Sequence, residues 1–199
     1  MNIKIYCSGS IHKGSGDSKK LAWTDVERGQ VQSGASPGYI TFLNPDDPSP
    51  DLSDTMANFG RDLYQVHLAD AVVVDGRERR GIGIGIEIMA SRIFRTLLVV
   101  VVPRNTYYRM DSVTYRGSNV RDYVHPHLRS LADVIVETFE EAGRWIYENA
   151  KTKQVEPKGI DVVDEAMSVY KERLLPHDKP MRDLAEDRQS NHNFNLDGS

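Results

Sequence analysis

Two clusters of glycine and serine follow segments with the composition of buried strands. The first is Ser8-Gly9-Ser10, after the apolar run Ile3–Cys7, and the second is the run Gly81–Gly85, which opens a helix. Backbone N–H groups at such strand-to-helix turns, together with the positive end of the helix dipole, bind phosphate or carboxylate groups. Each cluster alone is also explained by a tight turn. Two clusters at the same edge of one sheet favour a shared site for an anionic ligand.

Two carboxylates are candidates for chemistry beside this site. Glu87 lies just beyond the second glycine cluster, and we expect it in the first turn of the helix. There the helix dipole favours the ionised carboxylate, which is the form that a nucleophile needs. The alternative is that Glu87 only complements the dipole. Asp62 lies near the edge of the apolar stripe of an earlier helix, where the alternative is an ordinary exposed carboxylate.

Cofactor sites are weakly indicated. The second glycine cluster matches half of the Gly-x-Gly-x-x-Gly fingerprint of nicotinamide dinucleotide sites, but Ile86 replaces the third glycine. The acidic residue expected about 20 positions later falls in the apolar strand Leu97–Val102. His125 and His127 lie at a helix start with no cysteine partner and no clear third metal ligand. We therefore expect neither a nicotinamide cofactor nor a metal ion.

Alternating strand and helix patterns must position these residues. We expect strands at Ile3–Cys7, Tyr39–Leu43, Ala71–Val74 and Thr96–Val102, and a possible short strand at Val120–Tyr123. We expect helices between Asp17 and Gln32, from Ser53 or Asp54 to Leu68, after the second glycine cluster, from Pro126 through Ile146, and at Ile160–Leu175. This order is typical of a doubly wound α/β fold of the Rossmann or flavodoxin type, with a mainly parallel five-stranded sheet flanked by helices. Ligands of such sheets bind at the carboxyl ends of the strands.

The chain divides into an α/β domain at residues 1–150 and a C-terminal helix with a tail at residues 151–199. The last 24 residues, from Pro176, contain five apolar residues, which are too few to offset the entropy of ordering that stretch. We interpret this stretch as a tail or an arm that needs a partner.

Composition excludes several classes of partner. The 199 residues include 25 basic and 29 acidic ones, and the net charge of −4 gives no global electrostatic reason to bind nucleic acid or an anionic membrane. The longest apolar run, Thr96–Pro103, is far shorter than the roughly 18 residues needed to span a bilayer. The one cysteine, Cys7, cannot form an intrachain disulfide, and the chain begins with a strand-like run rather than an export signal. We expect a cytoplasmic protein that acts on a small molecule.

Four segments taken together resemble the nucleoside 2-deoxyribosyltransferase superfamily. They are Ile5–Ile11, Asp62-Leu63 ahead of Leu68–Val74, Gly81–Ile88, and Ser112–Gly117, and the resemblance covers about Met1 to Asn149. Within that superfamily the sequence is most similar to the 2'-deoxynucleoside 5'-monophosphate N-glycosidases. The resemblance implies hydrolysis of the N-glycosidic bond of a nucleoside 5'-monophosphate, which releases free base and sugar 5-phosphate.

The resemblance also implies a catalytic group. It makes Glu87 the nucleophile on the anomeric carbon, the Tyr6 hydroxyl the group that orients it, and Asp62 the acid near the departing base. These roles fit the chemistry, because breaking an N-glycosidic bond develops an oxocarbenium ion at the sugar and negative charge on the base. One carboxylate must meet the carbon, and one proton donor must meet the base.

Binding residues follow from the same resemblance. Phosphate contacts are implied for Ser10, Ile11, His12 and the turn that contains Gly83 and Gly85. Ser112 is implied to reach into the site of a neighbouring subunit, so we expect a homodimer with shared sites. Gly81 stands where those N-glycosidases tend to have a serine, and His12-Lys13 replaces their Arg-Gly. Arg79, Arg80, Lys13 and Arg116 are candidates to supply the missing positive charge.

Two alternatives remain open at this stage. A deoxyribosyltransferase would keep the chemistry and replace water by a second base as the acceptor. A nucleotide-binding or sensing module would use the glycine turns without catalysis. The presence of Tyr6, Asp62 and Glu87 together ranks the module last.

Overall fold

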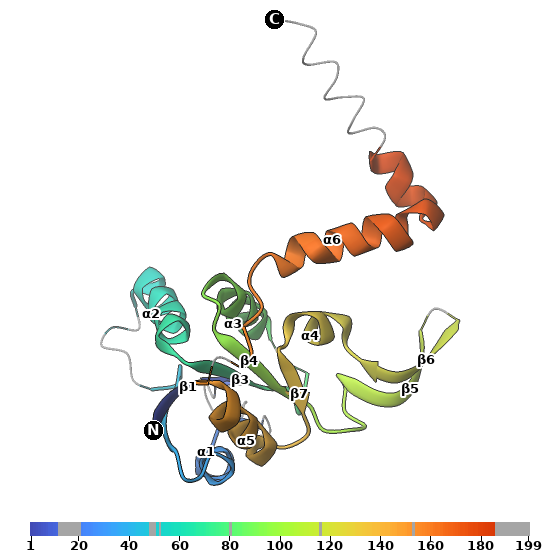
Figure 1. Cartoon of the computed structure of the whole chain (residues 1–199). Coiled ribbons are helices and arrows are strands. Elements are labelled where there is room, and N and C mark those ends of the chain that lie inside the picture. The colour runs from blue at the N-terminus through green and yellow to red at the C-terminus, as the bar shows by residue number, and fades with distance from the viewer. Residues whose placement is uncertain are drawn as a thin grey trace, which may run out of the picture. The chain divides into compact units, whose positions relative to one another are not determined.

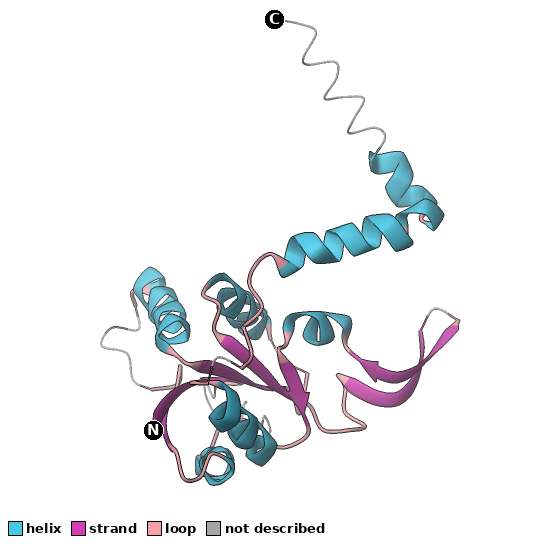
Figure 2. Ribbon diagram, in the orientation of Figure 1, coloured by secondary structure: helices cyan, strands magenta, loops and turns pink. Residues whose placement is uncertain are grey.

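The computed structural model describes residues 1–11, 21–47, 51, 53–79, 81–115, 117–152 and 154–185. Contacts divide the chain into two compact units, Met1–Ile160 and Asp161–Ser199. The first unit thus extends ten residues past the expected domain at residues 1–150. The first unit contains a five-stranded sheet with helices on both faces, and a two-stranded hairpin (Figures 1 and 2).

The sheet is wholly parallel, which confirms the expected architecture. Its strands are β1 (Asn2–Ser8), β2 (Tyr39–Leu43), β3 (Ala71–Asp75), β4 (Leu97–Val101) and β7 (Val134–Val136), in the spatial order β2-β1-β3-β4-β7. This is the flavodoxin-like order, in which ligands bind at the carboxyl ends of the first and third strands, where the winding reverses. Ser8 and Asp75 end those two strands.

Alternation along the buried strands assigns the helices to two layers. The helices of the first unit are α1 (Asp25–Gly34), α2 (Thr55–Leu68), α3 (Ile82–Ile93), α4 (Pro126–Leu131) and α5 (Phe139–Asn149). Tyr6 and Val72 belong to the core cluster that includes residues of α2, α3 and α4, whereas Ile5 and Val73 belong to the cluster that includes residues of α1 and α5. Successive strand residues point to opposite faces. The Tyr6 side chain therefore lies in the layer of α3.

The layer of α1 and α5 is very closely packed. A Cβ added to Gly143 of α5 would lie 2.0 Å from the Val31 carbonyl oxygen of α1. A Cβ added to Gly34 of α1 would lie 2.0 Å from the Glu140 carbonyl oxygen of α5. The two helices can approach this closely only because glycines stand at the crossing.

The prediction of one helix from Pro126 through Ile146 is wrong, because the middle of this segment is not helical. The structure breaks it into α4, strand β7 and α5. Val134-Ile135-Val136 is a β-branched run that fits an edge strand beside β4, and the Thr138–Glu141 capping box starts a new helix. Apolar residues at helical spacing hid this break, because a three-residue strand is too short to show its own period.

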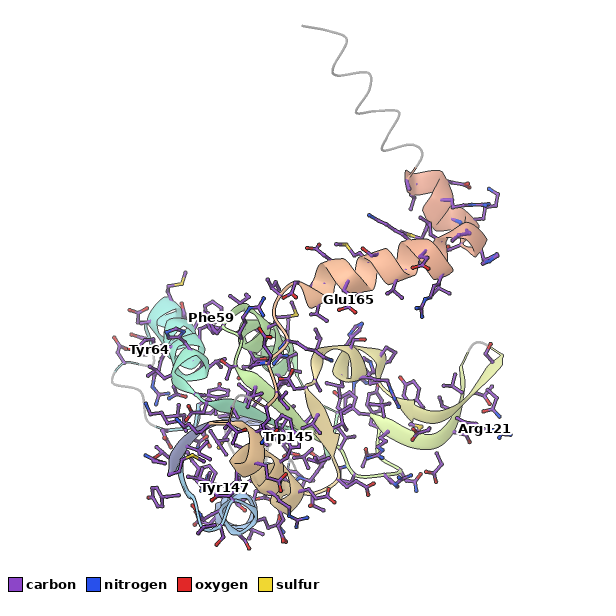
Figure 3. The ribbon with its side chains drawn as sticks, in the orientation of Figure 1. Phe59, Tyr64, Arg121, Trp145, Tyr147 and Glu165 are labelled. Atoms are coloured by element: carbon purple, nitrogen blue, oxygen red, sulfur yellow. The ribbon has the colours of Figure 1, made fainter. Side chains whose placement is uncertain are left out.

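The short strand expected at Val120–Tyr123 exists, but it does not belong to the main sheet. It is part of β6 (Ser118–Val124), which pairs antiparallel with β5 (Arg109–Tyr115) in a separate hairpin. The hairpin is largely exposed, and the Arg121 side chain extends from it into solvent (Figure 3). The fifth strand of the main sheet is β7 instead.

Capping residues set the helix starts near the ligand edge. Asp54 caps α2 through a hydrogen bond from the Ala57 amide, as expected. Helix α1 starts only at Asp25, later than expected, because Thr24 and Glu27 form a capping box there. Ala22 instead makes an isolated parallel bridge with Ser10.

The second unit contains α6 (Val162–Arg173), close to the expected bounds, followed by a short 3-10 helix at Leu175–His177. None of the α6 residues is buried. Residues 179–185 are helical, so the stretch expected to be a tail contains a helix. No helix among the described residues has both the length and the apolar character needed to cross a membrane.

Candidate active site

The ends of β1 and α3 bring three side chains together. The Tyr6 hydroxyl donates a hydrogen bond to Glu87 Oε1 at 2.9 Å, and the Ser8 hydroxyl donates one to Glu87 Oε2 at 2.5 Å. Tyr6 and Ser8 are two positions apart on one strand, so their side chains point to the same face. Each carboxylate oxygen of Glu87 therefore has its own hydroxyl donor.

Glu87 does not lie in the first helical turn, contrary to expectation. It is the sixth residue of α3, whose N-cap is Gly81, so it lies in the second turn. The helix dipole acts mainly within the first turn. Burial instead raises the pKa of Glu87 to about 7, while the Ser8 and Tyr6 hydroxyls lower it and the nearby Asp62 charge raises it. Burial and the hydroxyl pair, rather than the dipole, decide the protonation of this carboxylate.

Asp62 projects from α2 into the same cavity as Glu87. The cavity has a volume of about 430 Å³, and its lining comes from Gly9–Ile11 after β1, from Asp62, and from Glu78, Arg79, Gly81–Ile84 and Glu87. Partial burial raises the pKa of Asp62, whereas the neighbouring Arg61 lowers it. A carboxyl group with a raised pKa is suited to donate a proton near neutral pH. The cavity therefore has both the Glu87 and the Asp62 carboxyl groups in its lining, at the ligand edge of the sheet.

The cavity also has a region suited to an anion. Gly81 caps α3 without any side-chain hydrogen bond, so the first N–H groups of the helix are not satisfied by a capping side chain. Gly81 and Gly83 line the cavity, and a Cβ at either position would meet nothing within 4 Å. Arg79 contributes a guanidinium to the lining, and Glu78 contributes a carboxylate. The N-terminus of α3 and Arg79 together can hold a negative group.

Several predicted binding residues fall in this cavity and others do not. Ser10, Ile11 and Gly83 line it, whereas Gly85 lines a separate apolar groove between α2 and α3. His12 lies outside the described residues. Ser112 is exposed on β5 and lines a different cavity, with Asn105–Tyr107, Met110 and Asp111. In a single chain the Ser112 side chain therefore does not contribute to the lining of the Glu87 cavity.

Sequence reasoning missed the contact made by Ser8. It placed Ser8 in a turn cluster, but β1 continues through Ser8, where the side chain is fully buried. Extending the period of two by one residue past Cys7 would have placed the Ser8 hydroxyl on the face of Tyr6. Cys7 itself is buried on the opposite face, as expected for a small apolar residue.

A charged cluster supports the end of β1 from the other face. Arg77 donates hydrogen bonds to Asp75 at 2.9 Å and to Glu27 at 2.7 Å, and its guanidinium lies 4.9 Å from the centre of the Phe139 ring. The Trp23 indole N–H donates to the Ser8 carbonyl at 3.1 Å. Asp75 and Glu27 are both buried, so each needs the opposite charge that Arg77 supplies.

Among the described residues, no group of three or more His, Cys, Asp or Glu side chains is arranged to hold a metal ion. The rings of His125 and His127 contact each other edge to face, with their centres 5.0 Å apart.

The fold has a solved counterpart. A 2-desoxiribosyltransferase from Leishmania mexicana superposes with a TM-score of 0.51 and 13% sequence identity, over 74% of this chain and 98% of that chain. The protein has the fold of a 2-deoxyribosyltransferase. A 2-deoxyribosyltransferase from Bacillus psychrosaccharolyticus is also similar, with a TM-score of 0.49 and 15% identity, over 78% of this chain and 98% of that chain. No family model and no curated protein sequence matches this chain.

The deoxyribosyltransferase fold confirms the fold class that the sequence resemblance implied. The likeness covers most of the chain, although few residues are identical. At this level of identity it shows the fold alone. The particular closeness to the monophosphate N-glycosidases stays a prediction.

Proposed function

We propose that this protein hydrolyses the N-glycosidic bond of a nucleoside 5'-monophosphate, with Glu87 as nucleophile. The observation that carries the proposal is the Glu87 carboxylate, which two hydroxyl groups hold in a cavity that Asp62 also lines. A buried carboxylate with a pKa near 7 has no evident role in packing, because burial works against its charge. Perturbed carboxyl groups in a cavity are typical of catalytic sites.

The reaction would proceed in two steps. In the first, a Glu87 oxygen attacks the anomeric carbon and the carbon–nitrogen bond breaks, so that its electron pair leaves with the base. Asp62 in its protonated form gives the base a proton as it departs. In the second, Asp62 removes a proton from water while the water oxygen attacks the same carbon and releases Glu87. Both carboxyl groups then return to their starting protonation states.

The 5'-phosphate would lie at the N-terminus of α3, near Gly81, Gly83 and Arg79. Binding energy from this remote group can hold the sugar in reacting geometry. Ser10 and Ile11 line the same cavity and are assigned phosphate contacts in this proposal. His12, Lys13, Arg80 and Arg116 lie outside the described residues, and substituting each one tests whether it contributes to phosphate binding.

A second candidate is a deoxyribosyltransferase, in which a free base replaces water in the second step. The fold shared with the Leishmania mexicana enzyme favours it. Adding a free base to the reaction and looking for a new nucleoside or nucleotide distinguishes the two.

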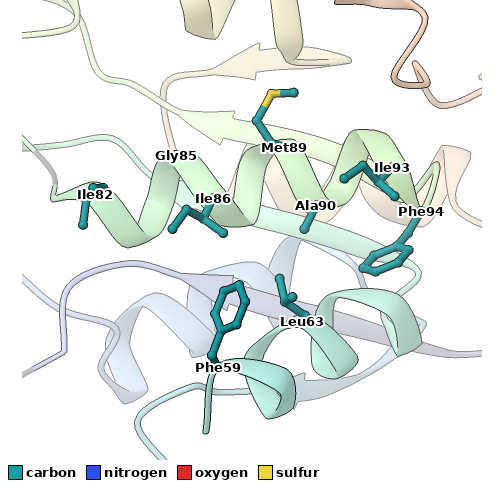
Figure 4. A pocket seen from close by; sticks show the side chains of 9 residues that line it. All are labelled: Phe59, Leu63, Ile82, Gly85, Ile86, Met89, Ala90, Ile93 and Phe94. Carbon is teal, nitrogen blue, oxygen red and sulfur yellow. The ribbon is translucent and has the colours of Figure 1, made fainter. Parts of the chain in front are cut away.

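We also propose that two copies of the chain form a homodimer with shared sites. An apolar groove between α2 and α3 is lined by Phe59, Leu63, Ile86, Ile93 and Phe94, among others (Figure 4). The Phe59 and Ile93 side chains are well exposed in the single chain. Ile82, which is 87% exposed, lines both this groove and the Glu87 cavity, so a copy seated on the groove would also border the site. Exposed apolar surface of this kind marks a protein interface.

A panel of nucleotides and nucleosides tests the proposed activity. The protein is incubated with each ribo- and deoxyribonucleoside, with and without a 5'-phosphate, and free base is measured by chromatography. We expect base release from at least one 5'-monophosphate and its loss by about a thousandfold or more in Glu87→Gln. Glu148→Gln, on the surface of α5, is the control. Tight nucleotide binding without release of base over hours would indicate a binding module instead.

A further inference from the structure

Ser8 is a fully buried serine to which the proposed reaction assigns no step of its own. It ends β1, opposite Val74 of β3 in the register of the sheet. Its hydroxyl donates to Glu87 Oε2, and Tyr6 donates to the other oxygen. A side chain that only filled space at this position would have no need of a hydroxyl.

The Ser8 backbone is held from the opposite side by Trp23. The indole N–H of Trp23 donates to the Ser8 carbonyl, and a Cβ added to Gly9 would lie 2.6 Å from Trp23 Cδ1. Trp23 thus packs directly on the backbone that follows Ser8. The Trp23 ring in turn meets Phe139 edge to face, with ring centres 4.9 Å apart. These contacts hold the strand end from one face, while the Ser8 hydroxyl points toward Glu87 on the other.

Two donors suit a carboxylate that has lost most of its water. Hydrogen bonds to the ionised form favour that form, whereas burial and the charge of Asp62 on α2 oppose it. Glu78 and Arg79, which lie before α3, line the same cavity and bring one charge of each sign. Each carboxylate oxygen has two lone pairs, so one hydrogen bond to each oxygen still leaves a lone pair for attack on carbon.

We propose that Ser8 is a second positioning residue for Glu87, which fixes the plane of the carboxylate and stabilises its ionised form together with Tyr6. The role of this pair in turnover rests on the proposed function. The hydrogen bond itself and its effect on the ionisation of Glu87 do not depend on any substrate.

Three variants of Ser8 separate hydrogen bonding from packing. Ser8→Ala removes the donor, and Ser8→Cys keeps a side chain of similar size with only a weak donor. Ser8→Thr keeps the hydroxyl, and a β-branched residue suits a strand. Cys7→Ala is the matched control, because Cys7 is the buried neighbour that faces the opposite layer.

The primary readout is the titration of Glu87 by NMR with carbon-labelled glutamate, in which Glu87→Gln assigns the signal. We expect Ser8→Ala and Ser8→Cys to raise the Glu87 pKa by about one unit, which lowers the ionised fraction about tenfold below pH 7. Ser8→Thr and Cys7→Ala should titrate like the unmodified protein. Where nucleotide cleavage is observed, the acidic limb of the kcat/KM profile should move by the same amount.

An unchanged Glu87 titration in both Ser8→Ala and Ser8→Cys would overturn the proposal, as would a Ser8→Thr variant that shifts as far as Ser8→Ala does. Suppose that neither the unmodified protein nor any variant cleaves a nucleotide, but the Glu87 pKa rises in Ser8→Ala and Ser8→Cys as expected. The proposed function then fails, and the role of Ser8 stands. If base is released but the Glu87 pKa is the same in the Ser8 variants as in the unmodified protein, the function stands and the role of Ser8 fails.

Discussion

The Tyr6 hydroxyl donates a 2.9 Å hydrogen bond to Glu87 Oε1, and these two residues lie 81 positions apart in the sequence. Tyr6 is fully buried on β1, and Glu87 comes from α3 in the helical layer above the sheet. Burial and the Glu87 charge both raise the pKa of Tyr6, so its hydroxyl stays protonated and acts only as a donor to the carboxylate.

Tyr6→Phe should therefore lower kcat by about 10- to 100-fold with little change in KM. The phenyl ring keeps the packing, whereas the carboxylate loses one of its two orienting donors. Steady-state kinetics on the best substrate of the panel measure the split. Tyr39→Phe, at the exposed start of β2, is the control and should behave like the unmodified protein. A normal kcat in Tyr6→Phe contradicts the orienting role.

Asp62→Asn should slow the release of natural bases by about 100-fold or more, because the departing base loses its proton donor. A substrate with p-nitrophenol in place of the base needs no such proton, since phenolate is already a stable leaving group. Its cleavage should be affected much less by the same change. Asp164→Asn in α6 serves as the control. Equal losses for both substrates would show that Asp62 does not act as the acid.

The activity should depend on pH through Glu87. Its pKa is raised to about 7, chiefly by burial, and only the ionised form can attack carbon. As pH falls below about 7, kcat/KM should decrease tenfold per pH unit, and at higher pH it should decrease again as Asp62 loses the proton that the departing base needs. Initial rates across pH 4 to 9 measure the profile, with the folded state monitored by circular dichroism. An acidic limb near the ordinary glutamate pKa of about 4.3 would contradict the assignment of Glu87.

Mixed dimers test the shared site. Dimers made only of Glu87→Gln chains, or only of Ser112→Ala chains, should have no more than a small fraction of the normal activity. Mixing and reassociating them should recover about a quarter of the normal activity, because about half of the dimers are mixed and each has one intact site. Two tagged copies purified in sequence confirm that mixed dimers are present. No recovery in such dimers would contradict a site built from both chains.

The α1–α5 crossing predicts opposite effects for two glycines. Gly143→Ala should destabilise the fold by about 1 to 3 kcal/mol, because the new methyl group would collide with the Val31 carbonyl oxygen. Gly29→Ala, in α1, meets nothing within 4 Å and should stabilise the protein by about 0.5 to 1 kcal/mol. Urea unfolding measures both. Comparable stability of the two variants would mean that the helices are not in contact as described.

Local patterns in the sequence were enough to predict most of the fold. Apolar runs bounded by turn residues predicted four of the parallel strands, because strands buried on both faces need continuous apolar sequence. The same patterns predicted α2 and α3 and the ligand edge between them. They failed at β7, because Val134 and Ile135 continue the helical spacing of the apolar residues on either side and so resembled part of a longer helix. Only the pairing of β7 with β4 decides between the two, and that pairing is not local.

The sequence by itself determined the residue types at the candidate site, Tyr6, Asp62 and Glu87, and the glycine turns beside them. Tertiary structure decided how these residues act on one another. In the folded chain the Ser8 hydroxyl donates a hydrogen bond to the second oxygen of Glu87, and Gly85 lines the apolar groove instead of the Glu87 cavity. It also replaced the helix dipole by burial as the main influence on the charge of Glu87. The physical reason is that desolvation and side-chain hydrogen bonds depend on neighbours that are distant in sequence, whereas strand and helix patterns depend on near ones.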